Sequence, residues 1–288
     1  MLKNIIKSLA FRLPSVYQKL LWREIKLSIN KPALKEVILL SMTGKTHLNF
    51  LKYSIWSIAH NWSKLPLLYI YNDGSLNNEK IKTKITFWGN DLHIDNWEIC
   101  KKHHVELKRP ALINYANVDP FGKKLALILY HASISPTIWV DNDILFYKDF
   151  VSLIPQHSKE TETCGGCEDW MNAYHKEIVK FYPILSKFEN FNAGLLYIHG
   201  KDFYERYHLE EILNKIHPQY DFFTEQSIFA KFASESLGKV WSKKVILNFN
   251  SDKQEIAPMN IKNSIARHYT SNIRHLFWRD LFFYFNKI

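Results

Sequence analysis

Residues 138–147 read Ile-Trp-Val-Asp-Asn-Asp-Ile-Leu-Phe-Tyr, so an apolar run ends in two aspartates one residue apart and then becomes apolar again. Burying a carboxylate among apolar side chains is costly, and two neighbouring carboxylates repel each other unless a positive charge lies between them. A divalent cation meets that need, because Mg²⁺ and Mn²⁺ prefer oxygen ligands and keep positions open for phosphate oxygens. Asp141 and Asp143 therefore predict a metal–diphosphate site at a strand end. The alternative is a solvated turn that closes the strand.

The segments around this stretch alternate between short apolar runs and longer helical patterns. Strands are predicted at 37–42, 65–71, 138–141, 193–198, 245–247 and 265–269, and helices at 47–60, 123–131, 202–216, 224–236 and from about 274 onward. Such alternation is typical of an α/β fold with a mostly parallel sheet flanked by helices, and those sheets bind ligands at the carboxyl ends of their strands. Asp73, Asp141 and Asp143 fall at such ends.

The composition indicates one large domain with terminal additions. A chain of 288 residues with 47% hydrophobic residues supplies a large core, and 9 Gly and 10 Pro leave no long linker. We expect a helical segment over 1–35, the α/β domain over 36–270, and an aromatic and basic helix over 271–288. The longest apolar runs fall short of a membrane span of roughly 20 residues. A signal peptide needs an uninterrupted apolar stretch, whereas Lys7 and Arg12 interrupt the first apolar run of this chain. We therefore expect a cytoplasmic protein.

The formal charge of +10 is concentrated at the two ends of the chain. Residues 1–35 hold eight Lys or Arg against Glu24, and residues 261–288 hold five against Asp280. In the first segment apolar residues follow a helical spacing with basic residues toward the other side, as in a helix that lies on an anionic membrane surface. An amphipathic helix packed on the protein body has the same pattern. Nucleic acid is a third partner for basic ends, but no recognition motif supports it.

The three cysteines are too few, and of the wrong parity, for a disulfide framework. Cys164 and Cys167 have the spacing of a redox pair or of half a zinc site, but no second ligand pair lies at a suitable spacing. The sequence therefore gives little support for a functional role of this pair.

In their order along the chain, several motifs resemble those of nucleotide-sugar glycosyltransferases of the type-A (GT-A) fold. The resemblance is strongest to bacterial enzymes of the retaining galactosyl- and glucosyltransferase family (glycosyltransferase family 8), and it covers about residues 36–280. It rests on five pieces: Leu-Ser-Met-Thr-Gly at 40–44, Tyr-Asn-Asp-Gly at 71–74, Lys124 with Val-Asp-Asn-Asp at 140–143, Asn-Ala-Gly at 192–194, and Glu-Gln at 225–226 followed by His-Tyr-Thr at 268–270. Each piece alone is a weak signal.

The resemblance implies a Mn²⁺ or Mg²⁺ ion held by Asp141, Asp143 and His268. The ion would neutralise the leaving diphosphate as a Lewis acid. The donor-binding candidates are Thr43, Gly44, Tyr71, Asp73, Lys124, Asn142, Asn192 and Arg274. Lys124 and Arg274 would assist the diphosphate, since Lys and Arg are the usual phosphate partners. The late motif lacks the family's glycine and its Lys-Pro-Trp ending, so the role of Arg274 is less directly implied.

The candidates near the reacting sugar are Glu225, Asp169 and Gln226, since sugar hydroxyls need planar polar groups at fixed positions. No residue is a firm nucleophile or base. Several of these residues also have structural explanations: Tyr71 as a core aromatic, Asn192 as a turn or cap residue, and Glu225 with Gln226 as the polar first turn of a helix.

The predicted function is transfer of a hexose from a nucleotide-sugar, taken to be a UDP-hexose, to a glycan or lipid-linked acceptor in bacterial cell-surface polysaccharide synthesis. Retention of anomeric configuration follows only from the family resembled. An aspartate-nucleophile phosphohydrolase also uses D-x-D after an apolar strand, but it has a hydroxyl residue where this chain has Leu145. A non-catalytic carbohydrate- or membrane-binding module is the third reading, and it leaves the acid pair unexplained.

Overall fold

The computed structural model describes residues 31–89, 91–155, 162–236, 238–249, 261, 263–270 and 273–285. The predicted membrane-surface helix at the start of the chain lies outside these residues, apart from positions 31–35. In the described part no helix is both long and apolar enough to cross a membrane.

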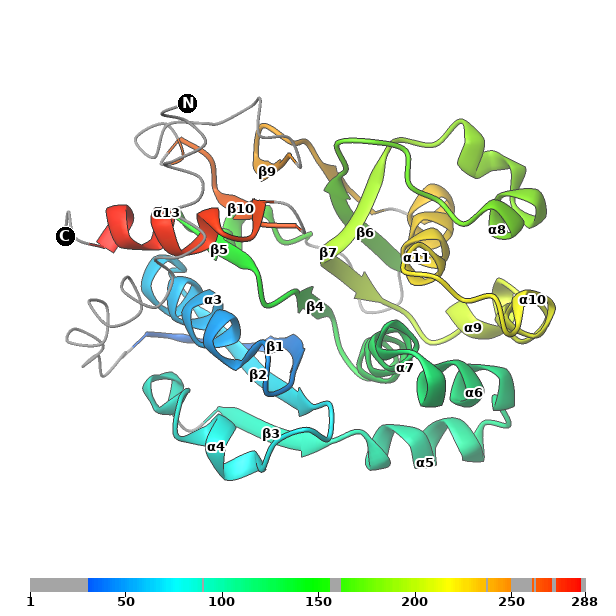
Figure 1. Cartoon of the computed structure of the whole chain (residues 1–288), viewed down its shortest axis with the longest axis horizontal. Coiled ribbons are helices and arrows are strands. Elements are labelled where there is room, and N and C mark those ends of the chain that lie inside the picture. Colours follow the sequence, from blue (N-terminus) through cyan, green and yellow to red (C-terminus); the bar gives the residue numbers. More distant parts are fainter. Residues whose placement is uncertain are drawn as a thin grey trace.

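Two sheets form the centre of the molecule (Figure 1). The larger has the spatial order β3 (Leu92–Asn96), β2 (Leu65–Asn72), β1 (Ala33–Thr43), β4 (Thr137–Val140), β7 (Phe191–His199), β6 (Thr163–Glu168) and β8 (Val240–Trp241). The smaller sheet has the order β5 (Ile144–Phe146), β10 (Ala266–His268) and β9 (Ile246–Asn248). In the larger sheet β7 alone runs against the other described strands. The predicted mostly parallel α/β sheet is confirmed.

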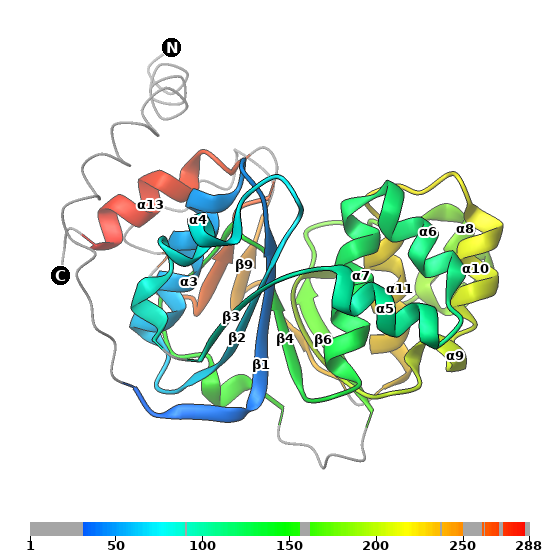
Figure 2. The same ribbon diagram turned by 90° about the horizontal axis from the view of Figure 1, so that it is seen from below.

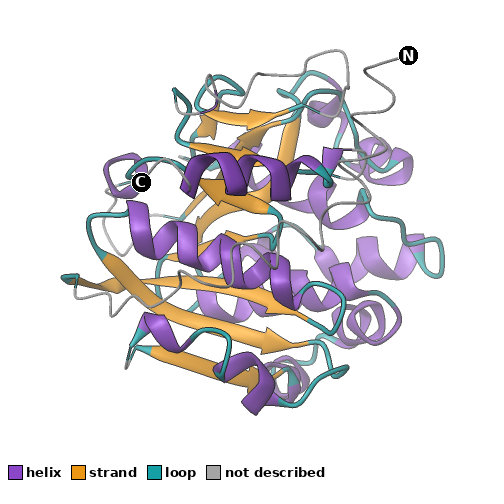
Figure 3. Cartoon of the chain, turned by 60° about the vertical axis from the view of Figure 1, so that its left-hand side comes forward, coloured by secondary structure: helices purple, strands orange, loops and turns teal. Residues whose placement is uncertain are grey.

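Helices cover both faces of the larger sheet (Figures 2 and 3). The described helices are α3 (Leu48–Asn61), α4 (Asn78–Lys82), α5 (Glu98–Glu106), α6 (Pro110–Val118), α7 (Pro120–Ala132), α8 (Lys176–Phe181), α9 (Phe203–Arg206), α10 (Leu209–Ile216), α11 (Thr224–Glu235) and α13 (Leu276–Phe285), with short 3-10 turns at Thr86–Trp88, Val151–Leu153 and Pro183–Ser186. Helices α3 and α13 lie on one face, whereas α5, α6, α7, α10 and α11 lie on the other.

Two apolar cores follow from this arrangement, one on each face of the sheet. In β1, Leu39 packs into one core and Leu40 into the other, and in β4 Trp139 faces away from Ile138 and Val140. Successive residues of a strand point to opposite faces, so a strand covered on both sides reads as a continuous apolar run. This explains why the segment before Asp141 is apolar throughout.

The Cys164 and Cys167 pair lies in β6, a strand that the sequence analysis did not predict. Both thiols are free and fully buried, and they belong to different cores, so they face opposite sides of the sheet. The glycines between them are needed for close packing: a Cβ at Gly165 would lie 2.4 Å from the carbonyl oxygen of Lys239, and one at Gly166 would lie 2.5 Å from the Phe191 ring. The motif is therefore a packing feature of β6.

Other departures from the predicted elements have local causes. The helix predicted over 202–216 is broken at His208, whose φ of +50° is left-handed, so α9 ends at Arg206 and α10 begins at Leu209. The region from 90 to 120, where no elements were predicted, holds β3, α5 and α6. Strand β3 lies at the sheet edge and none of its residues is fully buried, which explains its weak pattern.

Helix α13 is fixed to β10 by a buried network of charged and hydroxyl groups. Arg267 Nη1 donates to Asp280 Oδ2 at 2.9 Å, with side chains only 2% and 1% exposed. Tyr269 donates to the same oxygen at 2.9 Å, and Arg279 donates to the other one at 2.8 Å. Tyr269 and Arg267 flank His268 on β10, so this network also fixes the strand that carries a predicted metal ligand.

Replacing Asp280 should destabilise the protein strongly. Asp280→Ala leaves the buried Arg267 guanidinium without its carboxylate, which we expect to lower the free energy of unfolding by about 3–5 kcal/mol. Glu106→Ala removes one partner of an exposed Lys102–Glu106 pair on α5 and should leave the stability almost unchanged. Urea unfolding of both variants measures the difference. A similar small effect in the two would show that α13 is held by its apolar contacts alone.

Candidate active site

A cleft of about 340 Å³ opens at the carboxyl ends of β1 and β4. The predicted residues that line it are Lys124, Asp141, Asn142, Asp143, Asn192, Glu225, Gln226, His268 and Arg274. Residues separated by up to 150 positions in the sequence therefore lie around one cavity.

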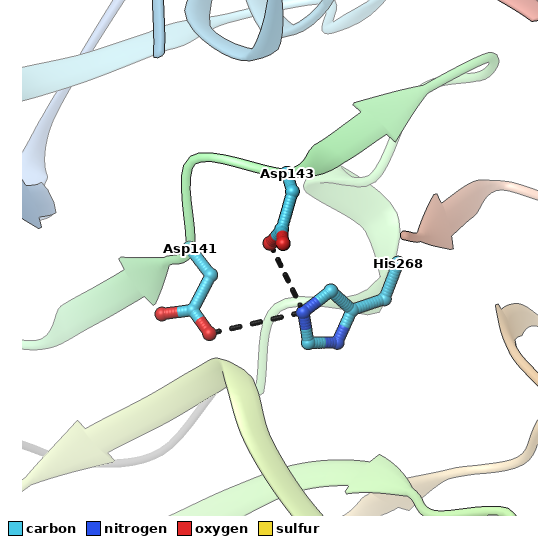
Figure 4. A group of neighbouring side chains, drawn as sticks. All are labelled: Asp141, Asp143 and His268. Carbon is cyan, nitrogen blue, oxygen red and sulfur yellow. Dashed lines mark ion pairs between the residues drawn. The ribbon is translucent and has the colours of Figure 1, made fainter. Parts of the chain in front are cut away.

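Strand pairing brings the acid pair and the histidine together. Asp141 follows β4, Asp143 precedes β5, and His268 pairs with Ile144 because β10 runs antiparallel to β5. The Nε2 atom of His268 lies 3.2 Å from Asp143 Oδ1 and 3.8 Å from Asp141 Oδ2 (Figure 4). One ligand atom from each residue lies within 4.8 Å of the others, so the three could hold a metal ion.

Asn192 orients the histidine. Its Oδ1 accepts from the Gly194 backbone N–H at 2.9 Å and lies 3.1 Å from His268 Nδ1. Its Nδ2 donates to Asp169 and to Gln226. Since Oδ1 can only accept, His268 Nδ1 must carry the proton, and Nε2 is directed at the two carboxylates. This is the arrangement that fixes a histidine as a metal ligand.

Asp143 is paired at both oxygens. Oδ1 faces His268, and Oδ2 accepts from Arg274 Nε at 2.9 Å and from Nη2 at 2.6 Å. Burial alone would raise the pKa of Asp143, but the hydrogen bonds and charges of His268 and Arg274 lower it to about 2. Burial alone would lower the pKa of His268, but the hydrogen bond and charge of Asp143, with Asp141 and Asp169, raise it. Asp143 therefore keeps its negative charge in the site.

Lys124 connects Asp141 with Glu225 in the lining of the cleft. Its Nζ lies 3.2 Å from Asp141 Oδ1, 3.0 Å from Glu225 Oε1 and 3.0 Å from the Ala193 carbonyl oxygen. Burial opposes its charge, but the two carboxylates raise its pKa. Burial raises the pKa of Glu225 to about 7, in spite of Lys124. Lys124 is thus a fixed positive charge, and Glu225 is a carboxyl group with a pKa near neutrality.

Asp169 does not line the cleft but lies behind two residues that do. Asn192 Nδ2 donates to its Oδ2 at 3.2 Å, with Gln226 Nε2 at 3.5 Å, and the Trp170 backbone N–H donates to Oδ1 at 2.7 Å. Burial raises its pKa, although these bonds oppose the shift. Asp169 therefore holds Asn192 and Gln226 in place, and direct contact with a sugar stays a prediction.

The nucleotide candidates at the first two strand ends do not line the cleft. Tyr71 is 2% exposed and its hydroxyl lies 2.9 Å from His131 Nε2, so it packs as a core aromatic, and its nucleotide role remains a prediction. Thr43 is buried and Asp73 exposed. The Asp73 carboxylate packs so closely on Gly44 that a Cβ there would lie 1.8 Å from Oδ2. A nucleotide role of Thr43, Gly44 and Asp73 remains a prediction.

The sequence analysis missed Trp139, Ser41 and Phe222. Trp139 Nε1 donates to Asp141 Oδ1 at 2.6 Å, and Ser41 Oγ donates to Asn142 Oδ1 at 3.1 Å. Trp139 precedes Asp141 by two positions, so strand alternation would have placed both on one side. Phe222 lines the cleft with 62% of its surface exposed, and no periodic pattern signals such a residue.

Comparison with solved structures identifies the fold. The galactosyltransferase LgtC, in complex with donor and acceptor sugar analogs, has a TM-score of 0.56 at 10% identity over 87% of this chain and 96% of that one. Mouse xyloside xylosyltransferase 1 gives 0.53 at 10% identity over 83% and 98%. The glycosyltransferase GlyE of Streptococcus pneumoniae TIGR4 gives 0.51 at 12% identity over 86% and 60%. No family model and no curated protein matches the sequence. The chain therefore has the GT-A glycosyltransferase fold.

Asn192 should determine how well the site holds a metal ion. Asn192→Ala frees the His268 ring to rotate or change tautomer, and loss of such an orienting partner typically weakens metal binding about 10–100-fold. Titration calorimetry with Mn²⁺ measures the change. Asn214→Ala removes an exposed amide that bonds Glu210 on α10 and is the matched control. Equal Mn²⁺ affinity in both variants would show that His268 is held without Asn192 or is not a ligand.

Proposed function

We propose that this protein is a metal-dependent glycosyltransferase that transfers a hexose from a nucleotide-sugar, taken to be a UDP-hexose, to a glycan or lipid-linked acceptor. The observation that carries the proposal is the meeting of Asp141, Asp143 and His268 in one cleft with the basic side chains of Lys124 and Arg274. Two acids and an imidazole suit a divalent cation, and the adjacent basic groups suit the phosphates that such a cation binds.

The donor set fits Mn²⁺ or Mg²⁺. Both ions take carboxylate oxygens, and the imidazole of His268 favours Mn²⁺, the transition-metal ion of the two. When bound, the ion would supply Lewis-acid neutralisation of the leaving diphosphate. Asp141 and Asp143 would hold it from the strand ends, and His268 would hold it through Nε2.

Other residues of the cleft have groups suited to charge stabilisation, sugar orientation and proton transfer. Lys124 is buried and paired, so it can place positive charge near the reacting groups without rearrangement. Asn192 and Gln226 are held by Asp169 and can orient sugar hydroxyls. Glu225, with a pKa of about 7 raised by burial, can hold or release a proton near neutral pH. The similar fold of LgtC, which was crystallised with donor and acceptor sugar analogs, supports two sugar subsites in such a cleft.

A screen of nucleotide-sugars for Mn²⁺-dependent hydrolysis tests the proposal, because slow donor hydrolysis needs no acceptor. We expect one UDP-hexose to be hydrolysed, the activity to vanish with a chelator, and Asp143→Ala to lower the rate at least 100-fold, or roughly 3 kcal/mol. Asp202→Ala, an exposed aspartate before α9, is the control. Phosphate released from simple phosphomonoesters instead would favour the phosphohydrolase alternative.

We also propose that the acceptor is reached at the cytoplasmic face of a bacterial membrane, with the basic chain ends on the anionic surface. The charge excess of residues 1–35 supports this, since each Lys or Arg near an anionic surface contributes about 1 kcal/mol to binding. Deletion of residues 1–30 should abolish co-sedimentation with vesicles that contain phosphatidylglycerol and leave donor hydrolysis intact. Undiminished vesicle binding would exclude a role for this segment.

A further inference from the structure

Arg274 already binds one carboxylate oxygen of Asp143, a predicted metal ligand. It precedes α13 and donates from both Nε and Nη2 to Asp143 Oδ2, while Asp143 Oδ1 faces His268 Nε2. Both carboxylate oxygens of this predicted ligand are therefore already bonded to cationic or proton-donating groups. A metal ion could take Asp143 through Oδ1, but the guanidinium on Oδ2 of the same carboxylate would weaken its binding, because the two positive charges repel.

The two basic residues of the site, Lys124 and Arg274, differ in how easily each side chain can move away from its carboxylate partner. The Lys124 side chain is 5% exposed and is enclosed by Asp141, Glu225 and the Ala193 carbonyl. The Arg274 side chain is 41% exposed, and the structure shows it bonded in the cleft to Asp143. Arg274 can therefore swing away from Asp143 by side-chain rotation, whereas Lys124 cannot move without repacking the core.

Once Arg274 leaves Asp143, its guanidinium group requires another anionic partner. If the cleft binds a nucleoside diphosphate, as the proposed function requires, the phosphate oxygens bring negative charge to the cleft that Arg274 lines. A guanidinium can bind two phosphate oxygens through two parallel N–H groups. At Asp143 its Nε and Nη2 converge on the single oxygen Oδ2, so a phosphate offers the same two donors at least as many acceptors. A metal ion bound without diphosphate would share the Asp143 carboxylate with the charge of Arg274, whereas with diphosphate bound Arg274 would be able to pair with the phosphates instead.

We propose that Arg274 couples metal binding to diphosphate binding, by competing with the metal ion for Asp143 and then pairing with the phosphates. The inference rests on the proposed function. Its thermodynamic consequence is reciprocal: nucleotide strengthens metal binding by the same factor by which metal strengthens nucleotide binding. Arg274 thus disfavours metal bound alone and favours the metal–nucleotide pair.

Titration calorimetry on the full chain tests this coupling. Mn²⁺ is titrated alone and with saturating UDP, and UDP is titrated with saturating Mn²⁺, for the wild type, Arg274→Gln and Arg206→Gln. Arg206 is an exposed arginine on α9 that pairs with Glu162 and serves as the control. In the wild type, UDP should tighten Mn²⁺ binding roughly 5–150-fold. In Arg274→Gln, Mn²⁺ alone should bind at least about fivefold tighter and UDP with Mn²⁺ more weakly, so the coupling factor should shrink.

The opposite sign of the two changes separates this role from a structural one, because loss of folding would weaken both. Unchanged or weaker binding of Mn²⁺ alone by Arg274→Gln would overturn the competition. Wild-type levels of coupling in that variant would overturn the coupling while leaving the glycosyltransferase proposal intact. Failure of the wild type to bind UDP with Mn²⁺ would overturn the proposed function and the coupling together. If Arg274→Gln does not fold, Arg274→Lys, which keeps the charge but loses the two-nitrogen fork, should show a smaller change of the same sign.

Discussion

The repulsion between Asp141 and Asp143 is the constraint on which the rest of the structure depends. Two carboxylates at the end of a buried strand are tolerable only if positive charge surrounds them. That charge comes from Lys124 on α7, His268 on β10 and Arg274 before α13. Neutralisation of the acid pair therefore depends on elements from both faces of the sheet. The buried Arg267–Asp280 pair matters for the same reason, because it fixes α13 to the strand that carries His268.

Two reversals of strand direction make the site possible. Strand β7 runs antiparallel to β4, so its beginning rather than its end lies beside Asp141, whose N–H donates to the Gly194 carbonyl. Strand β10 runs antiparallel to β5, and the Tyr269 N–H donates to the Asp143 carbonyl. If all strands were parallel, Asn192 and His268 would lie at the opposite edge of the sheet. The cleft is built at the carboxyl ends of parallel strands and completed by antiparallel ones.

Much of the fold could be predicted from the sequence because its central strands are covered on both faces and read as apolar runs. Strands β1, β2 and β4 were found in this way, and helices α3, α7 and α11 from the helical patterns between the strands. Strand β6 was missed because its glycines serve contacts with Lys239 and Phe191 that only the tertiary structure creates. At the site, motif order predicted which groups meet. It could not show that Asp169 lies behind Asn192, or that Tyr71 pairs with His131, since neither contact has a sequence pattern.

Asp141 and Asp143 are neutralised by different kinds of partner, one buried and one partly exposed. Asp141 is bonded to Trp139 and to a buried lysine that has no room to move. Asp143 is bonded to a histidine whose ring is fixed by Asn192 and to a half-exposed arginine. Of the two partners, only Arg274 can leave its acid without disturbing the core. Asp141 therefore keeps its side-chain partners on Oδ1 and offers Oδ2 to the cleft, and under the proposed coupling Asp143 is the group whose partner changes.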